Sequence, residues 1–228
     1  MKFKSVIVSC EHASNAVPAR WRAAFLGHEH VLNTHRAWDP GAALVARELA
    51  HALGVPAFFG EVTRLLIDLN RSADHPGLYS DFTPQSERAG LLKRYWRPYR
   101  GAVRTAVARA MKRGPTLHLS IHSFTPALDG KLRTTEFGLL YDPARPAEKQ
   151  FVLRWQRALR RMLPNMRTKL NNPYRGTSDG CTTALRAEFG RRYCGIELEM
   201  NHAFSAKPPD SWTDVRAAIV ASVVRVLA

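Results

Sequence analysis

The sequence is poor in cysteine and contains no long apolar run. Its three cysteines, Cys10, Cys181 and Cys194, are widely spaced and odd in number, which favours neither a disulfide framework nor a Cys-x-x-Cys metal site. We interpret them as reduced, structural residues. No stretch approaches the ~20 consecutive apolar residues that a membrane-spanning helix needs, and the first residues lack the apolar region of a signal peptide. We therefore expect a soluble, cytoplasmic protein that does not enter a membrane.

Acidic residues are scarce relative to basic ones. Lysine and arginine together number 34 against 19 aspartates and glutamates, which gives a net charge of +15. Such an excess is compatible with a nucleic-acid partner. However, the arginines are spread along helix-like segments, and the chain has no basic tail, zinc finger or RNA-binding signature. We therefore disfavour nucleic-acid binding and expect a basic surface that attracts a small anionic substrate.

What the sequence does contain is an alternation of short apolar runs with longer helical periods. The runs predict strands at residues 3–9, 56–59, 62–69, 117–122, 137–141 and 195–200. The helical periods cover residues 40–53, 84–112, 147–163 and 211–227. Strands joined by helices of this length predict an α/β fold, here a three-layer sandwich with a mixed, mostly parallel sheet.

The length of 228 residues predicts one domain, spanning residues 1–228. Three long loops interrupt the expected elements, at residues 72–83, 126–133 and 170–180. Loops of that size in a compact domain usually line a site. The sequence leaves the oligomeric state open.

Two histidines occupy equivalent places at the ends of predicted strands, which is where open α/β sheets bind their ligands. His12 and His122 each follow an apolar run. Two imidazoles and one carboxylate or amide oxygen make an open tetrahedral zinc site with a fourth position for water. Zinc there would acidify the water and polarise a carbonyl, while a nearby glutamate takes the proton. The alternative is two isolated histidines, one in the core and one on the surface.

A pair of carboxylates lies on the last predicted strand. Glu197 and Glu199 are two residues apart, so a strand places both on one face. Burying charge is costly without partners, so these side chains either face a cleft or belong to an edge strand with a solvated face. We favour the cleft and regard both as candidate catalytic residues.

Arginines around the segment 65–70 suggest a carboxylate clamp. Arg64 and Arg71 flank this segment, and the planar fork of arginine matches a carboxylate with two hydrogen bonds. Asn70 and Arg133 complete the candidate substrate-binding residues, and Asp68 is the expected orienting partner. The competing interpretation is a surface salt bridge.

Five short motifs, in this order along the chain, resemble the N-formylglutamate amidohydrolase family. They are Glu11-His12-Ala13-Ser14-Asn15-Ala16-Val17-Pro18, Trp38-Asp39-Pro40-Gly41-Ala42, Asp68-Leu69-Asn70-Arg71, His122-Ser123-Phe124-Thr125-Pro126 and Gly195-Ile196-Glu197. The resemblance covers residues 5–203. Because that family is related to zinc carboxypeptidases and aspartoacylase-like enzymes, it implies an α/β zinc-exopeptidase fold.

The resemblance also implies roles for individual residues. It makes His12 and His122 ligands of one zinc ion per chain, the segment 68–71 a clamp for an acyl amino acid, and Arg64 a substrate-binding residue. Glu197 matches the family's general base, although Glu199 could take that role. The relatives' His-x-x-Glu ends in Asn15 here, so the third metal ligand is left among Asp39, which we place in the candidate set, Asn15 and Glu11.

The function implied is zinc-dependent hydrolysis of the amide bond of an N-acyl amino acid such as N-formylglutamate. Two alternatives stay open at this point. One keeps the same machinery but acts on a peptide or cell-wall fragment, as a zinc carboxypeptidase or amidase would. The other is a non-enzymatic, basic nucleic-acid-binding module.

Overall fold

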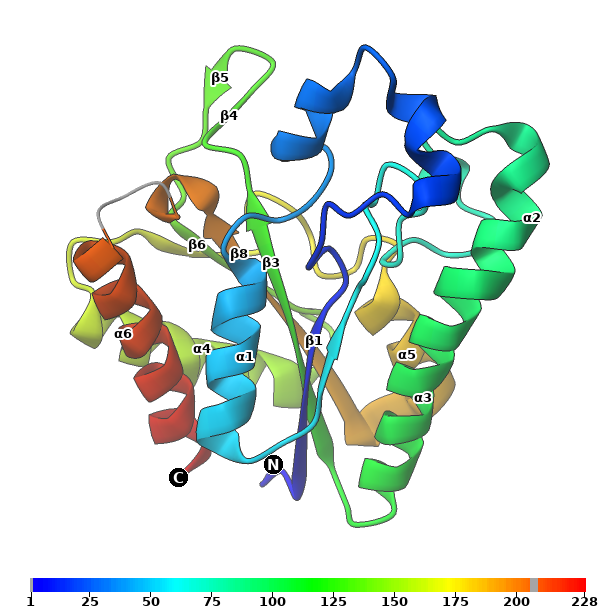
Figure 1. Ribbon diagram of the computed structural model, residues 1–228. Helices are drawn as coiled ribbons and strands as arrows, with labels where there is room; N and C mark the ends of the chain where they lie inside the picture. The colour runs from blue at the N-terminus through cyan, green and yellow to red at the C-terminus, as the bar shows by residue number, and fades with distance from the viewer. Residues whose placement is uncertain (1, 206–208) are drawn as a thin grey trace.

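A six-stranded sheet forms the centre of the protein, whose computed structural model describes residues 2–205 and 209–228. Its strands are β1 (Ser5–Cys10), β2 (Ala57–Phe59), β3 (Thr116–Phe124), β6 (Phe137–Leu140), β7 (Thr168–Leu170) and β8 (Tyr193–Asn201). They lie in the order β2-β1-β3-β8-β6-β7 (Figure 1). All neighbouring pairs are parallel except β6 and β8. The predicted mixed, mostly parallel sheet is confirmed.

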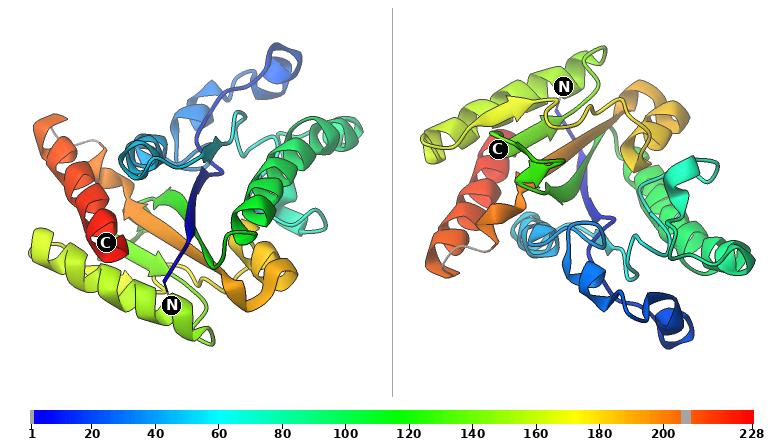
Figure 2. Two further views of the ribbon diagram at one scale, coloured as in Figure 1. Left: turned by 90° about the horizontal axis from the view of Figure 1, so that it is seen from below. Right: turned by 90° about the horizontal axis from the view of Figure 1, so that it is seen from above.

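Helices cover both faces of this sheet. The main ones are α1 (Ala42–Leu53), α3 (Arg97–Met111), α4 (Pro146–Met162), α5 (Cys181–Phe189) and α6 (Pro209–Leu227). Figure 2 shows α1, α4 and α6 on one side of the sheet and α3 and α5 on the other, which gives the three predicted layers. None of the described helices is both long enough and apolar enough to cross a membrane.

The two faces of the central strands differ in chemistry. Toward α1, α4 and α6, the strands present the apolar residues Val8, Cys10, Leu117, Leu119, Ile121, Ile196, Leu198 and Met200. Toward α3 and α5, they present Ile7 and Tyr193 together with a row of polar side chains. We call this row, made of Ser9, Glu11, His118, Ser120 and His122, the polar column; all five are buried. Because side chains alternate along a strand, one sheet carries an apolar core and a polar interior back to back.

Short elements form the rest of the fold. They are η1 (Ala19–Phe25), η2 (Glu29–Asn33), η3 (Pro76–Leu78), η4 (Gln85–Glu87), α2 (Arg88–Leu91), the π-helical turn η5 (Leu92–Trp96), η6 (Gly190–Arg192), η7 (His202–Phe204) and the hairpin strands β4 (Ala127–Leu128) and β5 (Lys131–Leu132). The predicted helix over residues 84–112 therefore exists as a run of four helical pieces. The hairpin β4–β5 and the helix α5 were not predicted.

The strand predicted at residues 62–69 is wrong. The segment forms turns instead. Its backbone amide and carbonyl groups hydrogen-bond to side chains and to other loops. The Thr83 hydroxyl donates to the Leu65 and Leu66 carbonyl oxygens at 3.0 and 2.7 Å, and the Arg64 amide donates to the Ala37 carbonyl at 3.1 Å. Its apolar side chains pack in a separate cluster with η1, η2 and α2. The apolar run reflected burial in that cluster and not pairing in the sheet.

Candidate active site

Three chain segments bring together a histidine, an aspartate and a second histidine. His12 follows β1, Asp39 precedes α1, and His122 lies near the end of β3. The Asp39 Oδ2 atom lies 3.3 Å from His12 Nδ1 and 2.9 Å from His122 Nδ1. One ligand atom from each of these buried residues fits within 4.8 Å of the others. The predicted set His12, Asp39 and His122 is therefore gathered at one point.

The two imidazole rings share one orientation relative to this point. Each turns its Nδ1 atom toward Asp39, and each has its Nε2 atom against another carboxylate. His12 Nε2 lies 2.6 Å from Asp68 Oδ1, and His122 Nε2 lies 3.2 Å from Glu11 Oε2. A metal-ligating histidine usually bonds its second ring nitrogen to a carboxylate or carbonyl in this way. The donor set, two Nδ1 atoms and a carboxylate, fits Zn²⁺.

Of the three residues left open for the third oxygen, Asp39 alone lies between the two Nδ1 atoms. Glu11 contacts the opposite side of the His122 ring. The Asn15 amide donates to the Leu32 carbonyl at 2.9 Å. Asp39 is itself held in place, since it accepts from the Ser123 backbone amide at 3.2 Å.

The charges at this point are strongly coupled. Burial on its own raises the pKa of Asp39, but the adjacent His12 and His122 outweigh it and hold that pKa well below the ordinary value. Burial likewise opposes the charged form of His122, whereas its hydrogen bonds to Asp39 and Glu11 raise its pKa well above the usual range. Asp68 has a depressed pKa because Arg64 and His12 outweigh its burial. The carboxylates are thus ionised and available to hold a cation.

The two glutamates of β8 face the same cleft. β8 lies between β3 and β6, so it is not an edge strand, and Glu197 and Glu199 line a cleft of about 220 Å³ together with His12, Asp39 and His122. Glu197 accepts a hydrogen bond from the Thr182 hydroxyl. Glu199 Oε2 is buried without a hydrogen-bond partner among the described residues. Burial raises the pKa of Glu199 to about 8, helped by the negative charges of Asp39 and Glu197 and opposed by His122.

The predicted clamp residues also line this cleft, apart from Arg133. Arg64 pairs with Asp68 at 2.6 Å and approaches Asp39 at 3.7 Å, so its salt bridge belongs to the site and not to the outer surface. Arg71 donates to the Asp179 carbonyl at 3.3 Å. Asn70 Oδ1 accepts from the Cys181 amide at 2.7 Å and so caps α5.

Arg133 is not among the residues that line the cleft. Its guanidinium lies 5.7 Å from the Phe124 ring centroid and 5.1 Å from that of Tyr174. It also donates to the Tyr174 hydroxyl at 2.9 Å. Tyr174 lines the cleft and Arg133 does not, so Arg133 reaches the site through Tyr174.

A family model described as N-formylglutamate amidohydrolase matches residues 4–205. The chain belongs to the N-formylglutamate amidohydrolase family. It is therefore a hydrolytic enzyme that acts on amides. A search of curated proteins found no match.

Solved structures carry the same fold. The gene product Atu2144 from Agrobacterium tumefaciens has a TM-score of 0.79 and 25% identity, over 97% of this chain and 90% of that one. N-formylglutamate amidohydrolase from Ralstonia eutropha JMP134 has a TM-score of 0.74 and 17% identity, over 100% of this chain and 94% of that one. At 17% identity, this similarity shows a shared fold and nothing more.

Several cleft residues of this family member were not singled out from the sequence. They are Ser123, Tyr174, Arg175, Ser178 and Asp179. Four of them belong to the loop 170–180, so the expectation that this loop lines a site is confirmed, whereas no residue of the loops 72–83 and 126–133 lines the cleft. The individual residues could not be found because long-range contacts place the loop. The Asp179 carboxylate, for example, accepts from the Ser72 amide at 3.0 Å.

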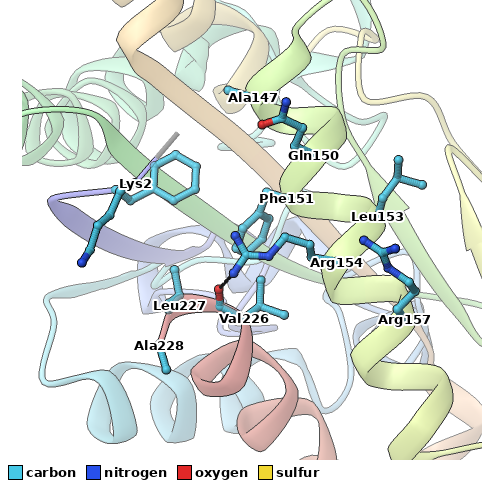
Figure 3. A pocket seen from close by; sticks show the side chains of 11 residues that line it. Lys2, Ala147, Gln150, Phe151, Leu153, Arg154, Arg157, Val226, Leu227 and Ala228 are labelled. Atoms are coloured by element: carbon cyan, nitrogen blue, oxygen red, sulfur yellow. Dashed lines mark hydrogen bonds between the residues drawn. The ribbon is translucent and has the colours of Figure 1, made fainter.

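A larger hollow, of about 480 Å³, is lined by α4 and by residues at both chain ends (Figure 3). Its lining residues are Lys2, Phe3, Ala147, Gln150, Phe151, Leu153, Arg154, Arg157, Val226, Leu227 and Ala228. Arg154 crosses it to donate to the Val226 carbonyl. Among the described residues, no histidine or acidic side chain lines it, so the smaller cleft is the candidate active site of this N-formylglutamate amidohydrolase family member.

Proposed function

We propose that this protein hydrolyses the amide bond of a small N-acyl amino acid, such as N-formylglutamate, with the help of one zinc ion. The observation that carries the proposal is the arrangement of His12, Asp39 and His122, with both Nδ1 atoms turned toward one carboxylate. These three residues would hold the ion. When bound, Zn²⁺ supplies Lewis acidity, which polarises a carbonyl and lowers the pKa of water.

The proton acceptor that we propose is Glu199. Its Oε2 atom has no partner among the described residues, and burial raises its pKa to about 8. A general base works best when its pKa lies near the operating pH, and it must reach the proton directly. Glu197, which the sequence motif favoured, is tied to the Thr182 hydroxyl one pleat away. Glu199 would take a proton from the attacking water and return it to the leaving amine.

Binding of the substrate carboxylate falls to Arg71 in this proposal. Arg64 is already paired with Asp68, whereas the Arg71 guanidinium has one hydrogen bond among the described residues, to the Asp179 carbonyl. The Asn70 side chain adjoins it. Arg64, which is nearer the candidate metal site, would orient the acyl group and support charge that develops on its oxygen.

Replacement of Arg71 by lysine is expected to raise KM about 10-fold while kcat changes little, because lysine cannot offer a carboxylate two hydrogen bonds in one plane. Steady-state kinetics with an N-acyl amino acid measures this. Arg94→Lys, an exposed residue outside the cleft, is the control. An unchanged KM in Arg71→Lys would remove this residue from the clamp.

The size of the cleft favours an amino acid derivative over a peptide or cell-wall fragment. At about 220 Å³, the cleft is smaller than the roughly 300–1,000 Å³ typical of sites for drug-sized ligands. The same machinery acting on peptides is thus the weaker candidate. The non-enzymatic nucleic-acid-binding module is set aside, because the chain belongs to a family of hydrolases.

A panel of N-formyl, N-acetyl and N-succinyl amino acids tests the proposal directly. We expect release of free amine from an acidic N-acyl amino acid, loss of this activity after dialysis against a chelator, and its return with Zn²⁺. The readout is amine formation, with an acylated dipeptide as the comparison substrate. Turnover of the dipeptide alone would support the peptidase alternative, and full activity after verified metal removal would contradict the zinc dependence.

A further inference from the structure

A continuous chain of hydrogen bonds runs through the polar column below the candidate metal site. It joins six side chains: one from β1, three from β3, one from β8, and that of Glu11, the residue that follows β1. In order they are Tyr193, His118, Ser9, Glu11, Ser120 and His122, and each is 2% exposed or less. The proposed function uses the last of them and leaves the other five without a role. Buried polar networks of this kind cost stability unless every member is satisfied.

The contacts along the chain are short throughout. The Tyr193 hydroxyl lies 2.7 Å from His118 Nδ1, and His118 Nε2 lies 2.7 Å from Ser9 Oγ. Glu11 joins the two halves, with Ser9 Oγ 2.8 Å from its Oε1 and Ser120 Oγ 2.6 Å from its Oε2. Ser120 Oγ then lies 2.9 Å from His122 Nε2.

Glu11 determines the direction of every bond in the first half. The Ser9 hydroxyl donates to Glu11 Oε1, and a hydroxyl has only one proton to give. The Ser9 oxygen can then only accept from His118, which places the proton of that ring on Nε2. His118 Nδ1 is left to accept from the Tyr193 hydroxyl. Burial lowers the pKa of His118 to about 4, in keeping with a neutral ring that has one donor and one acceptor.

Ser120 determines where the protons lie in the second half. Ser120 also gives its only hydroxyl proton to Glu11, so toward His122 its oxygen can only accept. His122 Nε2 must therefore carry a proton, which points to Ser120 Oγ and to Glu11 Oε2 at 3.2 Å. Nδ1, 2.9 Å from Asp39, is the nitrogen that remains to bind a cation.

We propose that this chain of hydrogen bonds sets the tautomer of His122. Glu11 and Ser120 are positioning residues that hold the proton on Nε2, so that Nδ1 binds the metal. Ser9 gives Glu11 a second hydroxyl donor, and His118 and Tyr193 extend this hydrogen bonding away from the candidate metal site. The inference rests on the proposed metal site. It differs from the arrangement at His12, where one carboxylate, Asp68, contacts Nε2 directly.

A glycine on the neighbouring strand makes room for the far end of the chain. Gly195 is the β8 partner of His118. A Cβ atom at this position would lie 2.9 Å from the Tyr193 hydroxyl and 2.9 Å from Thr182 Cβ. Both distances are shorter than real Cβ contacts, so a larger residue would displace the hydroxyl from His118.

Zinc affinity is the first test. The dissociation constant for Zn²⁺, measured by competition with a chromophoric chelator, should rise about 10- to 100-fold in Glu11→Gln and in Ser120→Ala. Ser222→Ala is the matched control, since Ser222 is also fully buried and accepts from Trp155 Nε1 at 2.9 Å, far from the site in α6. If Glu11→Gln and Ser120→Ala both fold and both bind Zn²⁺ as tightly as the wild type, the proposal is overturned.

Ring-nitrogen NMR of the wild-type protein is the second test and needs no variant to fold. In the metal-free protein, ¹⁵N shifts should show His118 protonated at Nε2 and bare at Nδ1. In the Zn²⁺-loaded protein, His122 should keep its Nε2 proton. A proton on His118 Nδ1, or coordination through His122 Nε2, would contradict the proposal. If the wild type binds no Zn²⁺, the proposed metal site fails, and the His118 measurement still decides the direction of the chain.

Discussion

The double variant His12→Ala/His122→Ala is expected to purify without zinc and to lose its amidohydrolase activity. Each replacement removes one of the two Nδ1 atoms that face Asp39, so a single carboxylate is left of the three ligand atoms. A structural or catalytic zinc site needs at least three protein ligands. Metal analysis of purified protein measures the effect, and we expect about one zinc ion per wild-type chain.

The control for this variant is His28→Ala/His51→Ala, which removes two exposed histidines away from the cleft. It should retain both metal and activity. Circular dichroism shows whether each variant is folded, which matters because Asp39 loses two buried partners. Zinc retained at wild-type stoichiometry in the folded His12/His122 variant would refute the site.

Replacement of Glu199 by glutamine is expected to lower kcat by about 10²- to 10⁴-fold, the usual contribution of general acid–base catalysis. The amide keeps the shape of the side chain but cannot accept the proton. Metal content should be unchanged, because Glu199 is not among the three gathered ligand atoms. Steady-state kinetics and metal analysis on the same preparation measure both quantities.

The pH profile separates a proton acceptor from a residue that only shapes the cleft. Glu199 accepts a proton only when ionised, and burial raises its pKa to about 8. Wild-type kcat should therefore fall on the acid side as Glu199 becomes protonated, and the glutamine variant should lack this limb. Glu197→Gln is the comparison variant. A larger loss in Glu197→Gln than in Glu199→Gln would exchange the two roles, and full activity in both would refute a glutamate base on β8.

Most of the sheet and the two candidate metal-site histidines were predictable because they depend on local patterns. The alternation of apolar and polar residues over 117–122 indicates a strand, and a strand alone places His118, Ser120 and His122 on one face. The same rule placed Glu197 and Glu199 together. That both carboxylates face a cleft followed from the cost of burying them without partners, and the central position of β8 confirms it.

What the sequence could not provide depends on contacts between distant segments. Arg133 was a sensible substrate-binding candidate from its loop, but its place behind Tyr174 depends on where residues 170–180 fold. The segment 62–69 has the composition of a strand, yet hydroxyls from Ser80 and Thr83 bind its carbonyl oxygens. The orientation of each imidazole ring depends on such contacts too, because the sequence is the same whichever ring nitrogen faces Asp39.

The polar interior of one sheet face has a consequence for how this protein can diverge. On the apolar face, side chains of similar volume can replace one another singly at modest cost. On the other face, replacing Ser9, Glu11 or Ser120 alone leaves a buried donor or acceptor without a partner, which destabilises the folded protein. Substitutions there should be tolerated only in compatible groups. Relatives that have drifted apart should therefore differ at these positions either together or not at all, and comparing them would show covariation across β1, β3 and β8.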